Sequence, residues 1–132
     1  MKKGKIIKSQ LDKNLTALNL DNKLVDVLLK FGISPNLLGY HYLKEGIKVL
    51  MNEPTYSSSI TKKMYPIIAN KFATTALRVE RGIRHALDVS YNKGKISYLN
   101  EMVGFEVYAD HYKPSNSEFV SLIADRLSLQ YK

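Results

Sequence analysis

The chain has 132 residues, of which 45% are hydrophobic, and this is enough for a single domain with a buried core. It contains no cysteine, so disulfide bonds and thiolate zinc sites are excluded. Twenty lysine and arginine residues against twelve aspartate and glutamate residues give a formal net charge of +8. Such an excess favours a polyanionic partner such as a nucleic acid.

The first eight residues carry four lysines and no acidic residue. We expect residues 1–8 to form a flexible basic arm, and a leader without a role in binding would have the same composition. The segment begins like a signal peptide, but Lys8 interrupts it before an apolar stretch can form. No other stretch is long and apolar enough for a membrane span, which predicts a cytoplasmic protein with no membrane partner.

Residues 9–31 carry leucines at helical spacing. Asn19 and Asp21 are expected to divide them into a short first helix and a second over about residues 22–30, which Gly32 ends. A further helix is predicted over residues 37–52, stopped before Pro54 and followed by a polar turn segment at 53–59. Its apolar stripe is expected to fill the core and consists of Leu38, Tyr42, Leu43, Ile47, Leu50 and Met51.

Residues 66–91 show the pattern of a helix-turn-helix. Pro66 fits the first turn of a short helix over residues 66–72, in which Ile68, Ala69 and Phe72 are expected to face inward. The small Ala69 allows two steeply crossing helices to approach closely. After the turn, Thr75 fits the N-cap of a second helix over residues 75–91, because its hydroxyl oxygen can accept from a first-turn amide. This arrangement predicts DNA binding.

The second helix has two different faces if each residue turns it by about 100°. One face is small and apolar and is expected to pack on the core: Ala76, Val79, Ile83, Ala86, Leu87 and Ser90. The other is charged: Arg78, Glu80, Arg81, Arg84, His85 and Asp88. Arginine matches guanine O6 and N7 or a phosphate, and glutamate can accept from cytosine N4. The charged face therefore predicts DNA recognition, with an ordinary solvated helix face as the alternative.

Three further segments complete the predicted fold. Residues 96–103 indicate a short helix closed by Gly104, and residues 105–107 a brief extended segment. A last helix is expected over about residues 116–129, after a loop that contains Pro114. The sequence therefore predicts one compact all-α domain over residues 9–132, with six or seven helices.

A catalytic or metal site is not expected. His41, His85 and His111 are not at metal-binding spacing, and no cluster of carboxylates accompanies them. The glycines are scattered at helix ends rather than gathered in a phosphate-binding loop. Ser57–Ser59 has no partnered base and is typical of a turn. We therefore expect no enzyme activity, no cofactor and no metal.

Several of these stretches resemble the effector domain of the stage-zero sporulation master regulator of endospore-forming Firmicutes. The run Arg78-Val79-Glu80-Arg81-Gly82-Ile83-Arg84-His85 matches a signature of that family, and residues 39–47, 59–62, 65–66, 68–72 and 113–119 match further stretches. The likeness spans roughly residues 24–129. It implies a six-helix, all-α domain that regulates transcription by binding double-stranded DNA, often as tandem copies.

The resemblance also implies roles for single residues. The helix that opens at Thr75 would enter the major groove of short TGTCGAA-like boxes, where Glu80 and Arg81 would reach base edges. Backbone and groove contacts would come from Thr74, Thr75, Arg78, Arg84 and His85. The segment 96–103 would help copies pair as a homodimer on tandem boxes, and RNA polymerase is a further candidate partner. Such a protein would be associated with the nucleoid.

Several features depart from the family pattern. Leu77 stands where a small polar residue is usual, so one phosphate contact would be missing. Gly82 replaces an alanine, at a cost to the helix of about 1 kcal/mol unless close packing requires glycine. Tyr91 replaces a tryptophan, and residues 1–23 cannot supply the family's receiver domain. An excised domain and a natural short paralogue both fit the sequence. An interaction module that antagonises a full regulator and binds DNA weakly is the alternative function.

Overall fold

The computed structural model describes residues 2–109 and 111–131, and the side chains of residues 2–8 lie outside that description. Within these residues six α-helices follow one another: α1 (Lys2–Lys30), α2 (Leu38–Asn52), α3 (Tyr65–Lys71), α4 (Ala76–Asn92), α5 (Tyr98–Val103) and α6 (Asn116–Ser128). A short 3-10 helix, η1 (Pro54–Ser58), and a π-helical turn, η2 (Ile60–Met64), lie between α2 and α3. No strand occurs among the described residues, which confirms the all-α, six-helix prediction.

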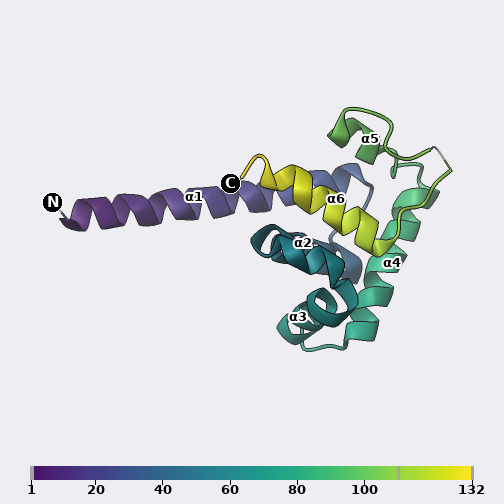
Figure 1. Ribbon diagram of the computed structural model, residues 1–132, viewed down its shortest axis with the longest axis horizontal. Coiled ribbons are helices and arrows are strands. Elements are labelled where there is room, and N and C mark those ends of the chain that lie inside the picture. Colours follow the sequence, from purple (N-terminus) through teal and green to yellow (C-terminus); the bar gives the residue numbers. More distant parts are fainter. Residues whose placement is uncertain (1, 110, 132) are drawn as a thin grey trace.

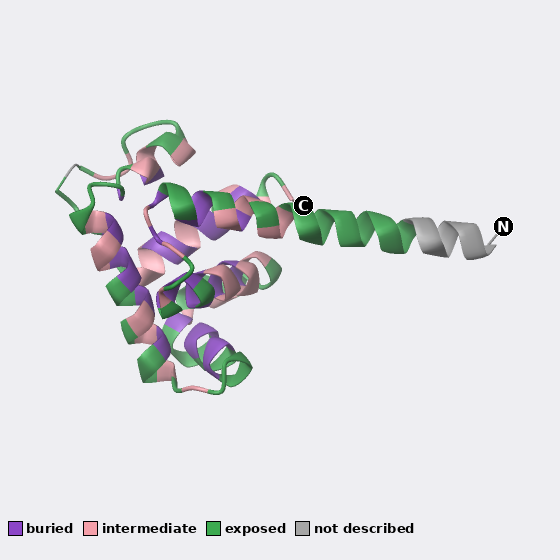
Figure 2. Ribbon diagram, turned by 180° about the vertical axis from the view of Figure 1, so that it is seen from behind, coloured by how far each residue is buried: buried purple, intermediate pink, exposed green. Residues whose placement is uncertain are grey.

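Helix α1 projects from one side of the molecule, and the other helices gather around its second half (Figure 1). The C-terminus lies beside α1, where the Tyr131 hydroxyl donates to the Asn19 carbonyl oxygen at 3.4 Å. Helix α4 lies on the side of the body away from the projecting end of α1. Figure 2 shows exposed residues along the described stretch of that projecting part, whereas the helices of the body turn buried residues toward one another.

The core forms where the second half of α1 meets α2, α4 and α6. Phe31 and Phe119 are fully buried and meet edge to face, with ring centroids 4.9 Å apart. Leu43 and Ile47 of α2 and Ile83 of α4 are also fully buried. Burying side chains of this size contributes about 1.5–3 kcal/mol each. The core therefore fixes α4 against the rest of the domain through one of its faces.

Helix α1 runs without a break through Asn19 and Asp21, so the division expected there is wrong. Asparagine and aspartate each cost a helix only about 0.7 kcal/mol, and residues 9–30 contain neither glycine nor proline. Lys48 Nζ lies 2.5 Å from the Asp21 carboxylate, and this hydrogen bond lowers the pKa of Asp21. A flexible basic arm was also predicted over residues 1–8. Met1 and the side chains of residues 2–8 are not described by the structure, so this arm stays a prediction.

Two apolar residues that were expected to face inward are exposed. Leu38 is 68% exposed because it lies about 130° around α2 from the centre of the buried face of that helix. Phe72 follows the last residue of α3 and meets the edge of the Tyr42 ring at a centroid distance of 5.4 Å, on the rim of the domain. The expected turn at 53–59 contains η1, and the segment 105–107, expected to be extended, has bends at Phe105 and Val107.

Helices α2 and α4 cross at two glycines. A Cβ atom on Gly39 would run into the carbonyl oxygen of Gly82 and would lie 2.7 Å from the Cβ of Ala86. A Cβ atom on Gly82 would lie 2.9 Å from two ring carbons of Tyr42. The close packing that would require glycine at position 82 is therefore present. Because neither glycine carries a side chain, the backbones of α2 and α4 can come into direct contact.

Gly39→Ala is expected to lower the free energy of unfolding by about 1–3 kcal/mol, because the added methyl meets backbone that cannot move aside. Gly46→Ala is the matched control in the same helix. Its added Cβ would meet Met64 Sδ at 3.2 Å, and that flexible side chain can move. Chemical denaturation of both variants measures the difference. An equal effect of the two substitutions would contradict the role given to Gly39.

Candidate nucleic-acid interface

The turn between α3 and α4 has a defined backbone. Helix α3 is followed by Phe72, and Ala73 then takes the left-handed conformation with φ of 51°. The Thr74 N–H donates to the Ala69 carbonyl oxygen at 2.9 Å, which is the hydrogen bond of a Schellman motif. Ala69 is buried, as predicted. The predicted helix-turn-helix is thus present, and its turn is fixed by hydrogen bonds to α3.

Thr75 caps α4, as predicted. Its backbone is extended, and its hydroxyl oxygen accepts a hydrogen bond from the Arg78 N–H at 3.2 Å. The cap fixes the first turn of α4, whose amide groups point out of the helix toward the turn that contains Thr74. A helix N-terminus carries partial positive charge, so this end of α4 suits a phosphate group.

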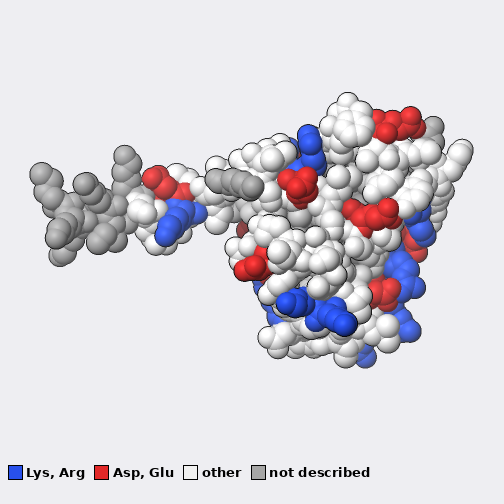
Figure 3. Space-filling model, in the orientation of Figure 1, with Lys and Arg blue, Asp and Glu red and all other residues white. Residues whose placement is uncertain are grey.

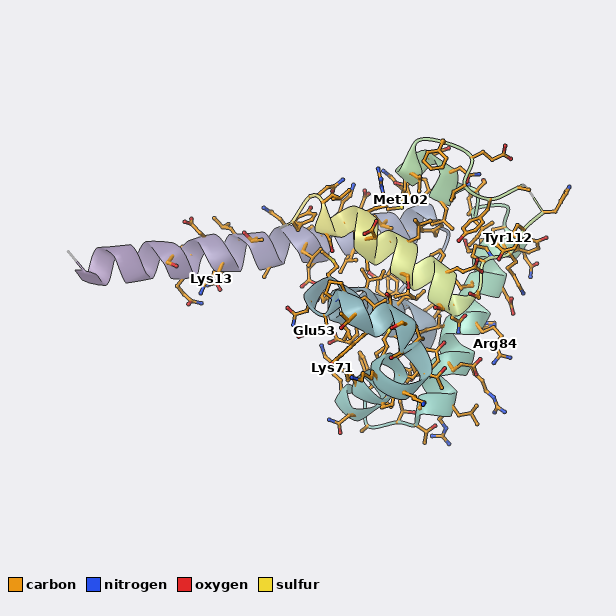
Figure 4. The ribbon with its side chains drawn as sticks, in the orientation of Figure 1. Lys13, Glu53, Lys71, Arg84, Met102 and Tyr112 are labelled. Atoms are coloured by element: carbon orange, nitrogen blue, oxygen red, sulfur yellow. The ribbon has the colours of Figure 1, made fainter. Side chains whose placement is uncertain are left out.

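The two faces of α4 are those that the sequence predicted. Val79, Ile83, Ala86, Leu87 and Ser90 are buried, and Ala76 is half-buried. The other face is exposed and carries Arg78, Arg81, Arg84 and His85. In Figure 3 basic side chains line the edge of the molecule that α4 forms, and Figure 4 shows Arg84 on the outer side of that helix. Helix α4 has 17 residues, and its basic ridge runs from Arg78 to His85, about 10 Å at a rise of about 1.5 Å per residue.

Glu80 lies at the edge of this ridge, with 28% of its side chain exposed. Its carboxylate accepts a hydrogen bond from the Arg84 guanidinium one turn further along α4. That hydrogen bond raises the pKa of Arg84 above the usual value of the guanidinium group. The partner that the sequence suggested for Glu80 is therefore the one observed, and the pair holds both side chains in place.

Asn116, the first residue of α6, fixes α4 from the side. Its amide nitrogen donates to the main-chain carbonyl oxygen of Glu80 and to the Tyr65 hydroxyl, each at 3.1 Å. Burial raises the pKa of Tyr65, which strengthens the preference of this hydroxyl for its neutral form. One amide thereby joins α3, α4 and α6 at the level of the exposed arginines. This contact limits rotation of α4 about its own axis.

A groove runs along the flank of α4 next to these contacts. It is lined by Glu80, Arg84 and Asp88 on α4, by residues 57–62 and by residues 112–118. Asp88 forms an ion pair with Lys113 across the groove. Each acidic residue of the predicted charged face therefore has a basic partner. This pairing reduces the repulsion that Glu80 and Asp88 would exert on a phosphate backbone.

The described side chains include no group of three His, Asp or Glu residues that could hold a metal ion. Across the part of the chain that the structure covers, no helix has both the length and the apolar character that a membrane span needs.

All seven predicted site residues lie on α4 or in the turn before it. The structure brings together the exposed ends of Arg78, Arg81, Arg84 and His85 on one face, and sets Glu80 at its edge. Sequence reasoning missed the contributions of Asn116 and Tyr65. Asn116 contacts Glu80 across 36 positions of sequence, so helical spacing gives no signal for it. Only the match of residues 113–119 to a family stretch pointed to this region.

A capped helix with a buried apolar face and an exposed basic face, preceded by a tight turn and a short helix, defines an all-α helix-turn-helix effector domain. The family model of the sporulation initiation factor Spo0A C terminal matches residues 24–127. The chain belongs to this family of DNA-binding transcription regulators, which confirms the resemblance noted in the sequence.

Asn116→Ala is expected to lower the free energy of unfolding by about 1–2 kcal/mol, because two partly buried acceptors lose their donor. Asn52→Ala, which removes an exposed amide at the end of α2, is the control and should change stability little. Thermal or urea unfolding of the two variants gives the comparison. If Asn116→Ala is as stable as the control, the amide does not hold α4 in position.

Proposed function

We propose that α4 enters the major groove of TGTCGAA-like boxes and that the chain acts there as a sequence-specific transcription regulator. The observation that carries this proposal is the outer face of α4, where three arginines and a histidine are exposed on a helix fixed through its other face. The major groove of B-DNA, about 12 Å wide, admits such a helix. Membership of a DNA-binding family supports DNA as the ligand.

The position of each side chain on α4 suggests its role. At about 100° per residue, Arg81 lies opposite the buried face, where it can reach furthest into a groove and contact guanine. Glu80, at the edge and held by Arg84, keeps acceptor sites for cytosine N4. Contacts to the DNA backbone or to the wall of the groove would come from Arg78, Arg84 and His85. Thr74 and Thr75, at the helix N-terminus, would meet phosphates.

The proposal extends to the partners that the family resemblance implied. Copies would pair as a homodimer on tandem boxes through the segment 96–103, which contains α5. RNA polymerase would be a further partner, and the protein would act at the nucleoid in the cytoplasm.

A second candidate function is an antagonist module with weak DNA affinity, and Leu77 is the residue that favours it. Leu77 is 54% exposed near the start of α4 and offers no hydrogen bond to a phosphate. An exposed leucine can still contact the methyl group of thymine. Gly82, the other departure on α4, is explained by its packing against Tyr42 and does not favour weak binding.

Arg81→Ala is expected to lower affinity for a TGTCGAA duplex by about 1–3 kcal/mol, because a bidentate guanine contact is lost. Affinity for a scrambled duplex should fall much less. Mobility-shift titrations of the wild type and the variant against both duplexes give the four constants. Arg126→Ala, which removes an arginine from α6, controls for the loss of one charge.

Two results would count against this reading. An equal loss on both duplexes would make Arg81 a phosphate contact. A wild type that binds the box no better than the scrambled duplex would favour the antagonist function.

Glu80→Ala separates base reading from charge attraction. Attraction alone predicts tighter binding to every duplex, because an acidic side chain near the phosphates is removed. Base reading predicts equal or tighter binding to scrambled DNA together with lost discrimination at one C·G pair of the box. Asp88→Ala is the matched control, since it removes an acidic partner of Lys113 from the same helix. Selection of sites from a random duplex pool decides between the two, and identical preferred sites would rule out reading by Glu80.

A further inference from the structure

Helix α1 carries a stripe of exposed leucines that its own domain does not cover. Leu11, Leu15 and Leu18 are 55%, 57% and 56% exposed, and Leu29, further along the helix, is 51% exposed. All four belong to α1, whose first half projects from the body and whose second half runs along it (Figures 1 and 2). An aligned row of four exposed leucines indicates a surface for a partner.

The stripe faces away from the domain core. At about 100° per residue, Leu11, Leu15, Leu18, Val25 and Leu29 fall within an arc of about 80°. The side chains that α1 buries in the core lie on the opposite side of the helix: Leu24, Val27 and Leu28, with the half-buried Leu20 beside them. Helix α1 is therefore apolar on two opposite faces, and its own domain uses one of them. Along Leu11, Leu15 and Leu18, which are all exposed, a partner can reach the free face.

The spacing along the stripe is that of a coiled coil. A coiled-coil heptad has two core positions. One of them is occupied by Leu11, Leu18 and Val25, which recur every seven residues, and the other by Leu15 and Leu29. Between Leu15 and Leu29, this second core position is occupied by Asn22, which is exposed. A single asparagine at such a core position favours two parallel strands in register, because its amide pairs with the same amide of the partner.

The residues on either side of the stripe indicate which kind of partner it can bind. Asp12, Asn14 and Asn19 border the stripe along residues 11–18, and Asp26, which is paired with Lys30, borders it further along. A helix that lies on an anionic membrane or tracks DNA would carry lysine or arginine at these places. Asp21 also borders the stripe but is paired with Lys48 of its own domain, which reduces repulsion between two copies. The surface therefore suits a second α1 better than a polyanion.

We propose that α1 is a dimerisation helix: two copies of this chain join through Leu11, Leu15, Leu18 and Asn22 in a parallel, in-register coiled coil that Val25 and Leu29 prolong. The two domains then lie on the outer sides of the pair, since each uses the opposite face of its α1. Residues 11–22 precede the stretch that the family model matches, so this interface belongs to the extension of α1. It is separate from the pairing through 96–103.

The size of the interface sets its expected strength. From residue 11 to residue 29 the seam is about 28 Å long, and a helix is about 10 Å wide. The contact therefore falls below the roughly 1,200–2,000 Å² of total surface buried in standard stable interfaces. The dimer should form in a concentration-dependent way rather than permanently.

Sedimentation equilibrium of the full chain without DNA tests the proposal, over about a hundredfold range of concentration up to the millimolar range. The wild-type mass should rise from 15.0 kDa toward twice that value. The double variant Leu15→Glu/Leu18→Glu should stay at the monomer mass throughout, while its domain still unfolds cooperatively on heating. The control Gln10→Glu/Ala17→Glu adds the same charge beside the stripe and should dimerise like the wild type.

The direction of the strands is tested separately, because the chain has no cysteine of its own. Asn22→Cys should form an interchain disulfide under oxidation if the strands are parallel and in register. In an antiparallel pair, position 22 would lie opposite position 11 of the partner, and the single variant would not cross-link. A wild type that stays monomeric, or a leucine variant that dimerises as well as the control, would overturn the dimerisation proposal. Monomers that instead co-sediment with anionic vesicles would assign the stripe to lipid.

Discussion

The domain depends on the place where α2 and α4 cross. Gly39 and Gly82 leave no side chains between the two backbones, and Tyr42 fills the space beside them. Because no side chains lie between the two helices at this crossing, it fixes the distance between α4 and the core. The exposure of Arg78, Arg81 and Arg84 follows from it, because the same helix that is held tightly on one face is free on the other. Fixing the helix before binding reduces the ordering that recognition would otherwise require.

Two further contacts complete the orientation of α4. The threonine cap and the turn hydrogen bond define where the helix begins, and the Asn116 amide limits its rotation from the α6 side. The Glu80–Arg84 pair then orders two side chains at the edge of the outer face. Together these contacts present a rigid basic ridge, and rigidity at this surface is what sequence-specific reading of a groove requires.

The parts that could be predicted from the sequence depend on local rules. Helical spacing placed Val79 and Ile83 inside and Arg81 outside, and the Thr75 cap needs only residues within one turn. The parts that were missed depend on contacts between distant residues. The residues next to Gly39 in the sequence give no sign that it touches Gly82. Asn19 was expected to interrupt the first helix because asparagine is common at helix ends, but α1 continues through it. The leucines of α1 illustrate the same limit, since their spacing predicts a helix but not which face the domain covers.

We propose that DNA binds to the outer face of α4. Amide chemical-shift mapping of the isotope-labelled chain during titration with a TGTCGAA duplex tests it most directly. The largest changes are expected at residues 74–85, with smaller ones at the same positions on a scrambled duplex. Changes confined to α1, α5 or α6, with α4 unaffected, would contradict the claim.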